Sequence, residues 1–108
     1  MKIALTDGVL NVSEIDELAT GNASSFHSEL TAALPDGVRE IEIDMSRTDF
    51  VDCRGLGALI ALRNRARTTK GDVPIRLLNP PQPLQRMVSL MHMDGHFAIE
   101  EQLVSLAE

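Results

Sequence analysis

The chain has 108 residues, 44% hydrophobic but only 3% aromatic, so we expect one domain, residues 1–108, with a core of aliphatic side chains. Its net charge of -6 disfavours nucleic acid as a partner and disfavours a polybasic membrane-binding patch. A single cysteine excludes an internal disulfide, no apolar run reaches the ~18 residues of a membrane span, and no export signal is evident, so we expect a cytoplasmic protein.

Two strands are predicted first, over residues 2–5 and 9–15, because apolar residues recur there at every second position. The Asp-Gly pair between them predicts a tight hairpin turn. Residues 20–34 then read as a helix with one apolar stripe, capped by Thr20 or Asn22.

The rest of the chain alternates strands with helices. Residues 38–45 predict a strand in which Ile41 and Ile43 face the core while the acidic residues between and beside them face away. The later predicted elements are a helix from residue 53 to 67, a strand at 73–78, a helix at 84–93, a strand at 97–101 and a final helical turn at 102–108. The order β-β-α-β-α-β-α-β predicts an α/β fold with a mixed central sheet and helices mainly on one side.

The stretch "DFVDCRGLGALIALRNRAR", residues 49–67, contains the most informative helix start. Asp52 is placed to cap the helix by accepting a backbone N–H, and its charge suits the helix dipole. Gly55 and Gly57 each cost a helix about 1 kcal/mol relative to alanine, which is understandable if something approaches the backbone closely. No phosphate-binding glycine pattern is present, so nucleotide binding is rejected.

Catalytic and metal chemistry are disfavoured by the spacing of the candidate groups. Cys53 as a nucleophile would need a nearby base, and the histidines lie on other predicted elements. Asp44 and Asp52 are better explained as a strand-end carboxylate and a cap than as an acid-base pair. The motif His92-x-Asp94-x-His96 lacks evident further metal ligands. We therefore expect no enzyme, no metal and no cofactor, and we interpret the methionines at 87, 91 and 93 as core residues.

Two long stretches together resemble the STAS domain, the fold of bacterial anti-sigma factor antagonists. They are "EIEIDMSRTDFVDCRGLGALIALRNRA" and "IRLLNPPQPLQRMVSLMHMDGHFAI". The matching features are a strand ending in Asp44, a second aspartate at Asp52, Gly-Leu-Gly opening a helix, and an Asn-Pro pair after the next strand. Residues 13–19, "SEIDELA", are similar to the family's Gly-Glu-Leu-Asp turn with Ser13 in place of glycine.

The resemblance implies a binding protein rather than an enzyme. Antagonists of this family bind an anti-sigma factor of ATPase-like kinase fold and so release a sigma factor. By resemblance, Asp44 supports the neighbouring loop. The residues expected at the partner surface are Ser46, Asp52, Cys53, Arg54, Gly55 and Gly57. The alternative is a scaffold or sensory module that binds another STAS protein, a second copy of itself or a small ligand.

The sequence departs from the family at the phosphoacceptor. Where the kinase partner would phosphorylate a serine, this chain has Cys53, and Arg54 follows. Neither accepts phosphate from a Ser/Thr kinase, so the resemblance implies that phosphorylation at this position does not switch the protein. Three interpretations of Cys53 stay open: a near-isosteric serine substitute in a constitutive binder, a redox sensor, or a residue of a scaffold that has lost its kinase.

Overall fold

A five-stranded mixed sheet forms the centre of the computed structural model, which describes residues 1–32, 34, 38–70, 73–91 and 97–100. The strands lie in the order β1-β2-β4-β6-β7. Their bounds are β1 Lys2–Thr6, β2 Val9–Ser13, β4 Glu40–Asp44, β6 Ile75–Leu78 and β7 Ala98–Glu100. Only β1 runs antiparallel to its neighbour, whereas the other three pairs are parallel. The predicted mixed sheet is therefore confirmed.

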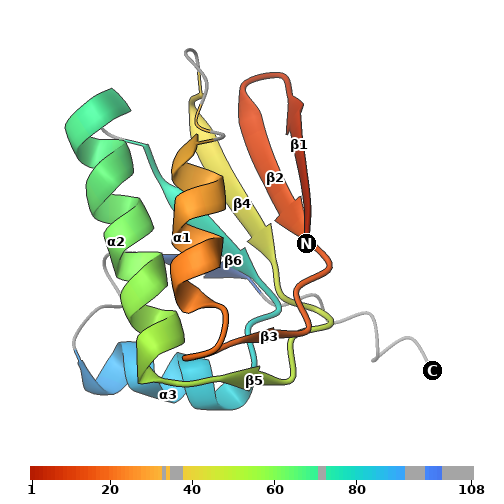
Figure 1. Cartoon of the computed structure of the whole chain (residues 1–108), viewed down its shortest axis with the longest axis vertical. Helices are drawn as coiled ribbons and strands as arrows, with labels where there is room; N and C mark the ends of the chain where they lie inside the picture. Colours follow the sequence, from red (N-terminus) through yellow and green to blue (C-terminus); the bar gives the residue numbers. More distant parts are fainter. Residues whose placement is uncertain (33, 35–37, 71–72, 92–96, 101–108) are drawn as a thin grey trace.

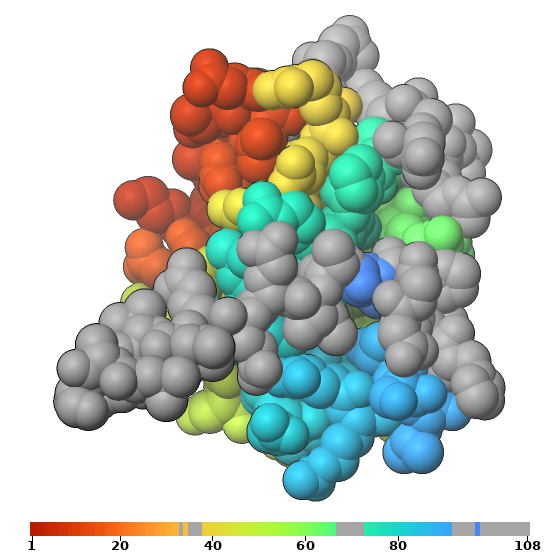
Figure 2. All heavy atoms as spheres, turned by 180° about the vertical axis from the view of Figure 1, so that it is seen from behind, coloured from red at the N-terminus to blue at the C-terminus, as the bar shows by residue number. Residues whose placement is uncertain are grey.

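Two helices, α1 (Ala23–Ala32) and α2 (Cys53–Lys70), lie side by side over one face of the sheet (Figure 1). The third helix, α3 (Gln82–Leu90), lies across the end of the molecule at which α2 begins. Seen from behind, β4 and β6 reach the surface, with no described helix over them (Figure 2). The core therefore lies between the sheet and the α1–α2 layer.

The alternation predicted for β4 is present. Ile41 and Ile43 are fully buried, while Glu40 and Glu42 are partly exposed on the opposite face. On that face Arg76 of β6 donates to both carboxylates, with nitrogen–oxygen distances of 2.7 Å. The strand therefore contributes its aliphatic side to the core and its acidic side to an ion-pair cluster.

The Asp7-Gly8 turn also has the predicted form. Both residues have positive φ, 51° and 81°, as a type I′ hairpin turn requires. Thr6 pairs with Val9 directly across the turn. Glycine tolerates this backbone without strain and aspartate is among the residues that adopt it most readily.

Several predicted boundaries were wrong. The strand predicted over residues 9–15 ends at Ser13, because Glu14 has a φ of 58° and turns the chain out of the sheet. A second, two-stranded parallel sheet, β3 (Glu17–Leu18) with β5 (Phe50–Val51), was not predicted. Helix α1 begins at Ala23 rather than residue 20. The helical turn predicted at 102–108 lies outside the described residues.

Candidate partner-binding surface

Helix α2 begins at a carboxylate that holds two segments together. One oxygen of Asp52 accepts the Gly55 backbone N–H at 2.9 Å, which is the cap predicted from the sequence. The other accepts both the N–H and the hydroxyl of Thr20, at 3.0 and 2.9 Å. These hydrogen bonds, above all the one from Gly55, hold the pKa of the Asp52 carboxyl below its usual value. The ionised side chain thereby joins the start of α2 to the loop before α1.

Thr20 was predicted as a possible cap of α1 but contacts α2 instead. Asn22 holds the cap position, since its backbone carbonyl accepts the N–H of Phe26. Its side chain folds back, accepting the Ala19 N–H and donating to the Glu17 carbonyl, both at 2.8 Å. Asn22 therefore holds the 17–22 loop in the shape that presents Thr20 to Asp52.

The two glycines of α2 have different surroundings. Gly55 is buried, and a Cβ built on it would lie 2.0 Å from the carbonyl oxygen of Leu18 in β3. Gly57 is exposed, and a Cβ there would have no neighbour within 4 Å. Both glycines were expected to let a partner approach the backbone closely. At Gly55 the close neighbour in the structure is the chain's own backbone, whereas at Gly57 the space is open, and partner contact at either glycine stays a prediction.

The loop before β5 is held by the end of the sheet. Asp44 accepts the backbone N–H of Ser46 at 3.0 Å and its hydroxyl at 2.5 Å. Asn79, just after β6, donates its amide to the same hydroxyl at 3.0 Å. Sequence reasoning assigned Asp44 to this loop but missed Asn79, although the Asn-Pro pair of the family pattern marked the position.

A further set of contacts fastens the same loop to the segment before β3. The buried Thr48 hydroxyl donates to the Ile15 carbonyl at 2.6 Å. Arg47 forms ion pairs with Glu14 and Asp16, at 3.5 and 3.1 Å. None of these contacts was predicted, since each joins residues more than thirty positions apart in the chain.

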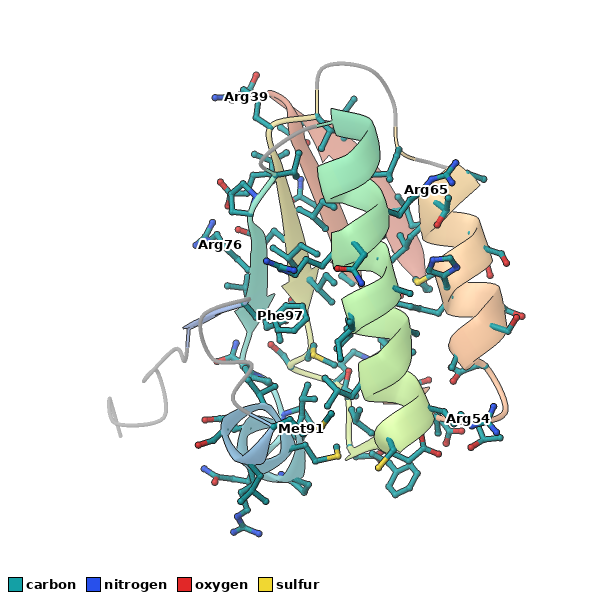
Figure 3. The ribbon with its side chains drawn as sticks, turned by 90° about the vertical axis from the view of Figure 1, so that its left-hand side faces the viewer. Arg39, Arg54, Arg65, Arg76, Met91 and Phe97 are labelled. Atoms are coloured by element: carbon teal, nitrogen blue, oxygen red, sulfur yellow. The ribbon has the colours of Figure 1, made fainter. Side chains whose placement is uncertain are left out.

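The side chains left outward on this surface are chemically varied. Cys53 and Arg54, in the first turn of α2, are both exposed, and Cys53 is a free thiol. Figure 3 shows Arg54 at this end of α2, beside the loop that leads into α1. Phe50 of β5 is 53% exposed, a large apolar side chain that sequence reasoning did not single out. Cys53, Arg54 and Phe50 thus expose their side chains on a backbone that the hydrogen bonds described above hold in place.

The remaining candidate groups lie elsewhere. His27 is on α1, where its ring contacts the Thr31 hydroxyl at 3.5 Å, and the His92–His96 motif lies outside the described residues. Within the part of the chain that is described, no three His, Cys, Asp or Glu side chains are grouped as metal ligands would be. No helix among the described residues is long and apolar enough to cross a membrane. Met87 packs against the core as predicted, whereas Met91 is 53% exposed.

Comparison with known proteins identifies the family. The family described as "Mlab, STAS domain" matches residues 3–105. The chain belongs to the STAS domain family. Among curated relatives of this STAS domain is BtrV of Bordetella bronchiseptica, provisionally named an anti-sigma factor antagonist. The two are 28% identical over 80 residues, which is 74% of this chain and 62% of BtrV, so the match spans less than two thirds of that relative.

Solved structures show the same fold. A provisionally named anti-sigma factor antagonist from Thermotoga maritima superimposes with a TM-score of 0.79, at 18% identity, over 98% of this chain and 90% of its own. SpoIIAA of Bacillus, in its phosphorylated form, gives 0.70 at 16% identity, over 98% of this chain and 94% of its own. At these identities the likeness establishes the STAS fold alone. The predicted fold class is thereby confirmed.

Proposed function

We propose that this STAS domain is an anti-sigma factor antagonist, which binds an anti-sigma factor and so releases a sigma factor. The family membership and the provisional name of BtrV support this proposal. The protein acts by occupying a surface of its partner rather than by catalysis. The observation that carries the proposal is the start of α2, where Asp52 anchors the backbone and leaves Cys53 and Arg54 exposed.

The proposed partner has the ATPase-like kinase fold that the family resemblance implies. Its contact centres on Cys53 and Arg54, with Ser46 and the open backbone at Gly57 at the margin. Asp52 and Gly55 contribute indirectly, because they position the helix rather than face outward. Exposed Phe50 adds an apolar side chain of the kind that dominates binding energy in protein interfaces.

Cys53 makes the proposed binding independent of phosphorylation at this position. A thiol is close to a hydroxyl in size but is not a substrate for a Ser/Thr kinase, so the partner cannot end the interaction by modifying residue 53. The proposed interaction is then controlled by the amount of protein in the cell or by a different chemical signal. Oxidation of the exposed thiol is one such input, since it would place a larger and more polar group in the contact.

The test starts with tagged protein as bait in a lysate of the source organism, followed by mass spectrometry. Recovery of an ATPase-fold anti-sigma factor supports the proposal, whereas recovery of STAS proteins alone contradicts it. With the partner in hand, Cys53→Asp is expected to weaken binding about tenfold or more, about 1.4 kcal/mol, because it adds a charge to the contact. Cys53→Ser is the matched control and should change the affinity less than about twofold. Equal affinities for both variants would exclude residue 53 from the contact.

A further inference from the structure

Strand β1 is a free edge of the central sheet. It comes first in the strand order, and Figure 1 shows no described segment beyond it. Exposed edges are usually protected by proline, a bulge or a charge in the middle of the strand, because their unpaired N–H and C=O groups attract other strands. The sequence of β1, "KIALT", has no proline, its pairing with β2 is uninterrupted, and its one charge is at the first position. This edge is therefore open to a further strand.

The hairpin turn determines which backbone groups of β1 point outward. The turn is closed by a hydrogen bond between the residues that flank it, Thr6 and Val9, so the N–H and C=O of Thr6 point toward β2. Antiparallel pairs alternate, so Ala4 also uses its backbone groups toward β2, whereas Ile3 and Leu5 direct theirs away from it. Two donors and two acceptors thus lie on the open side of β1.

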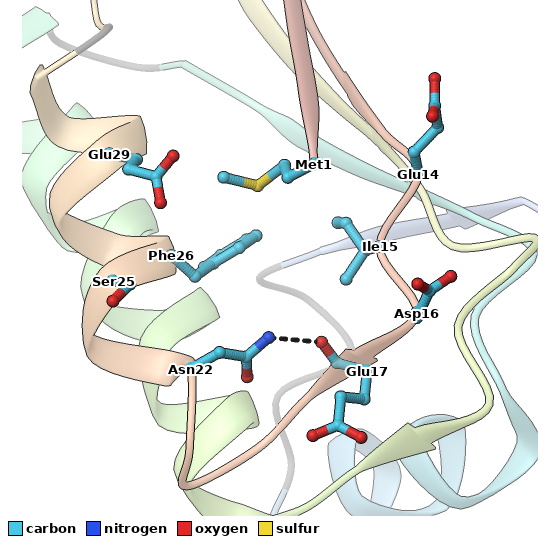
Figure 4. Close-up of a pocket in the computed structure, with 9 residues that line it drawn as sticks. All are labelled: Met1, Glu14, Ile15, Asp16, Glu17, Asn22, Ser25, Phe26 and Glu29. Carbon is cyan, nitrogen blue, oxygen red and sulfur yellow. Dashed lines mark hydrogen bonds between the residues drawn. The ribbon is translucent and has the colours of Figure 1, made fainter.

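The side chain of Leu5 adds an uncovered apolar group to this edge. Leu5 pairs with Leu10, which is buried on the face that the helices cover, yet Leu5 itself is 50% exposed. Ile3, on the same face, is partly buried against the core. A depression lined by Met1 and by Phe26 of α1 lies between that helix and the start of β1 (Figure 4). Beside β1 there is therefore room for another strand on the helix side.

We propose that β1 pairs with β1 of a second copy of this chain, antiparallel and in the register that places Ala4 opposite Ala4. The two central sheets then join into one. Ile3 and Leu5 of one copy form four backbone hydrogen bonds with Leu5 and Ile3 of the other, since in this register their outward groups face each other. Each Leu5 side chain packs beside Ile3 of the second copy. The copies are related by a two-fold axis, the commonest symmetry of homodimers.

The charges of β1 are compatible with a second copy in this register. Lys2 lies opposite Thr6 of the other copy. The two Lys2 side chains are four residues apart along the strands, about 13 Å, which exceeds the screening length of about 10 Å at 0.1 M salt. No acidic residue lies within β1, so the net charge of -6 is not concentrated at the contact. The strand is thus complementary to itself, as symmetric pairing requires.

Dimerisation is measured on the whole chain without any protein partner, so its outcome is independent of the antagonist function proposed above. The contact is small and belongs to the weak class, so we expect a dissociation constant of about 100 µM. Small-angle X-ray scattering should then show mostly monomer at about 10 µM and mostly dimer at about 1 mM. Over the same range, protection from amide hydrogen exchange should rise about threefold or more at Ile3 and Leu5, whereas Ala4 and Thr6 should change less than about twofold.

Charged substitutions at residue 4 test the register. Ala4 is exposed, and its side chain is on the face opposite to Ile3 and Leu5, so the monomer should tolerate the change. Ala4→Lys places two like charges directly opposite each other and should weaken dimerisation about fivefold relative to Ala4→Thr, the uncharged control. Ala4→Glu should have the same effect. An equimolar mixture of the Lys and Glu variants should associate within about twofold of the control, because opposite charges then face each other.

Three results would overturn the proposal. One is a chain that stays monomeric at about 1 mM, which would leave the edge to a strand of another protein. Another is equal association of Ala4→Lys and Ala4→Thr. The third is a mixture of the Lys and Glu variants that associates no better than either variant alone, because the two residues at position 4 would then not face each other.

Discussion

Replacing the two glycines of α2 with alanine should change stability in opposite directions. At residue 55 a Cβ would lie 2.0 Å from the Leu18 carbonyl oxygen, against about 3.3 Å for an ordinary carbon–oxygen contact, so β3 and α2 must separate by about 1.3 Å. Overpacking of this kind costs about 1–3 kcal/mol, and the better helix propensity of alanine offsets up to about 1 kcal/mol. We expect Gly55→Ala to lower the free energy of unfolding by about 2 kcal/mol. Gly57→Ala should raise it by about 0.5–1 kcal/mol, since a methyl group there meets open space.

Urea unfolding of both variants and of the parent protein measures the difference directly, and the slopes should agree if all three unfold in two states. The expected gap of about 3 kcal/mol corresponds to melting temperatures that differ by roughly 10 °C or more. Equal stabilisation by both substitutions would refute the close approach of α2 to β3. Equal destabilisation would mean that helix propensity does not govern the exposed site.

Three further predictions concern single side chains. The depressed pKa of Asp52 means that its charge stabilises the fold above the unfolded pKa, about 3.9, and that this contribution is lost as pH falls through the lower folded pKa. Asp52→Asn keeps a good cap but removes the charge, so urea unfolding should show its stability deficit at neutral pH shrinking below about pH 4. Thr48→Val leaves the Ile15 carbonyl without its buried donor and should lower stability by about 1–3 kcal/mol in the same assay; a neutral effect would contradict the hydrogen bond. Arg76→Met should lower stability by about 1 kcal/mol at low salt, and the deficit should shrink in about 1 M salt, because the ion pairs it removes are only partly buried.

The features that were predicted correctly from the sequence depend on interactions between residues a few positions apart in the chain. The alternation of Ile41 and Ile43 with acidic residues predicts which face of β4 is buried. The Asp-Gly pair at 7–8 predicts the hairpin because few other residues adopt its backbone angles easily. The cap at Asp52 depends on groups within three residues, so it too was predictable.

The features that were missed depend on partners far along the chain. The strands β3 and β5 have two residues each, too few to show any periodicity, and they exist because they pair with each other. The neighbour of Gly55 is an unremarkable leucine carbonyl thirty-seven positions earlier, which no spacing rule indicates. Nor does the sequence show that Thr20 contacts Asp52 rather than capping its own helix.

Asp52 and Cys53 are neighbours in the chain but have different roles at the start of α2. Asp52 holds the backbone through Thr20 and Gly55, while the exposed side chain of Cys53 makes no contact on which that hold depends. Evolution can therefore exchange the chemistry of residue 53 without rebuilding the helix start beneath it. Serine and cysteine codons can differ by a single base, so one mutation is enough to exchange a thiol for a hydroxyl at residue 53 on an unchanged scaffold.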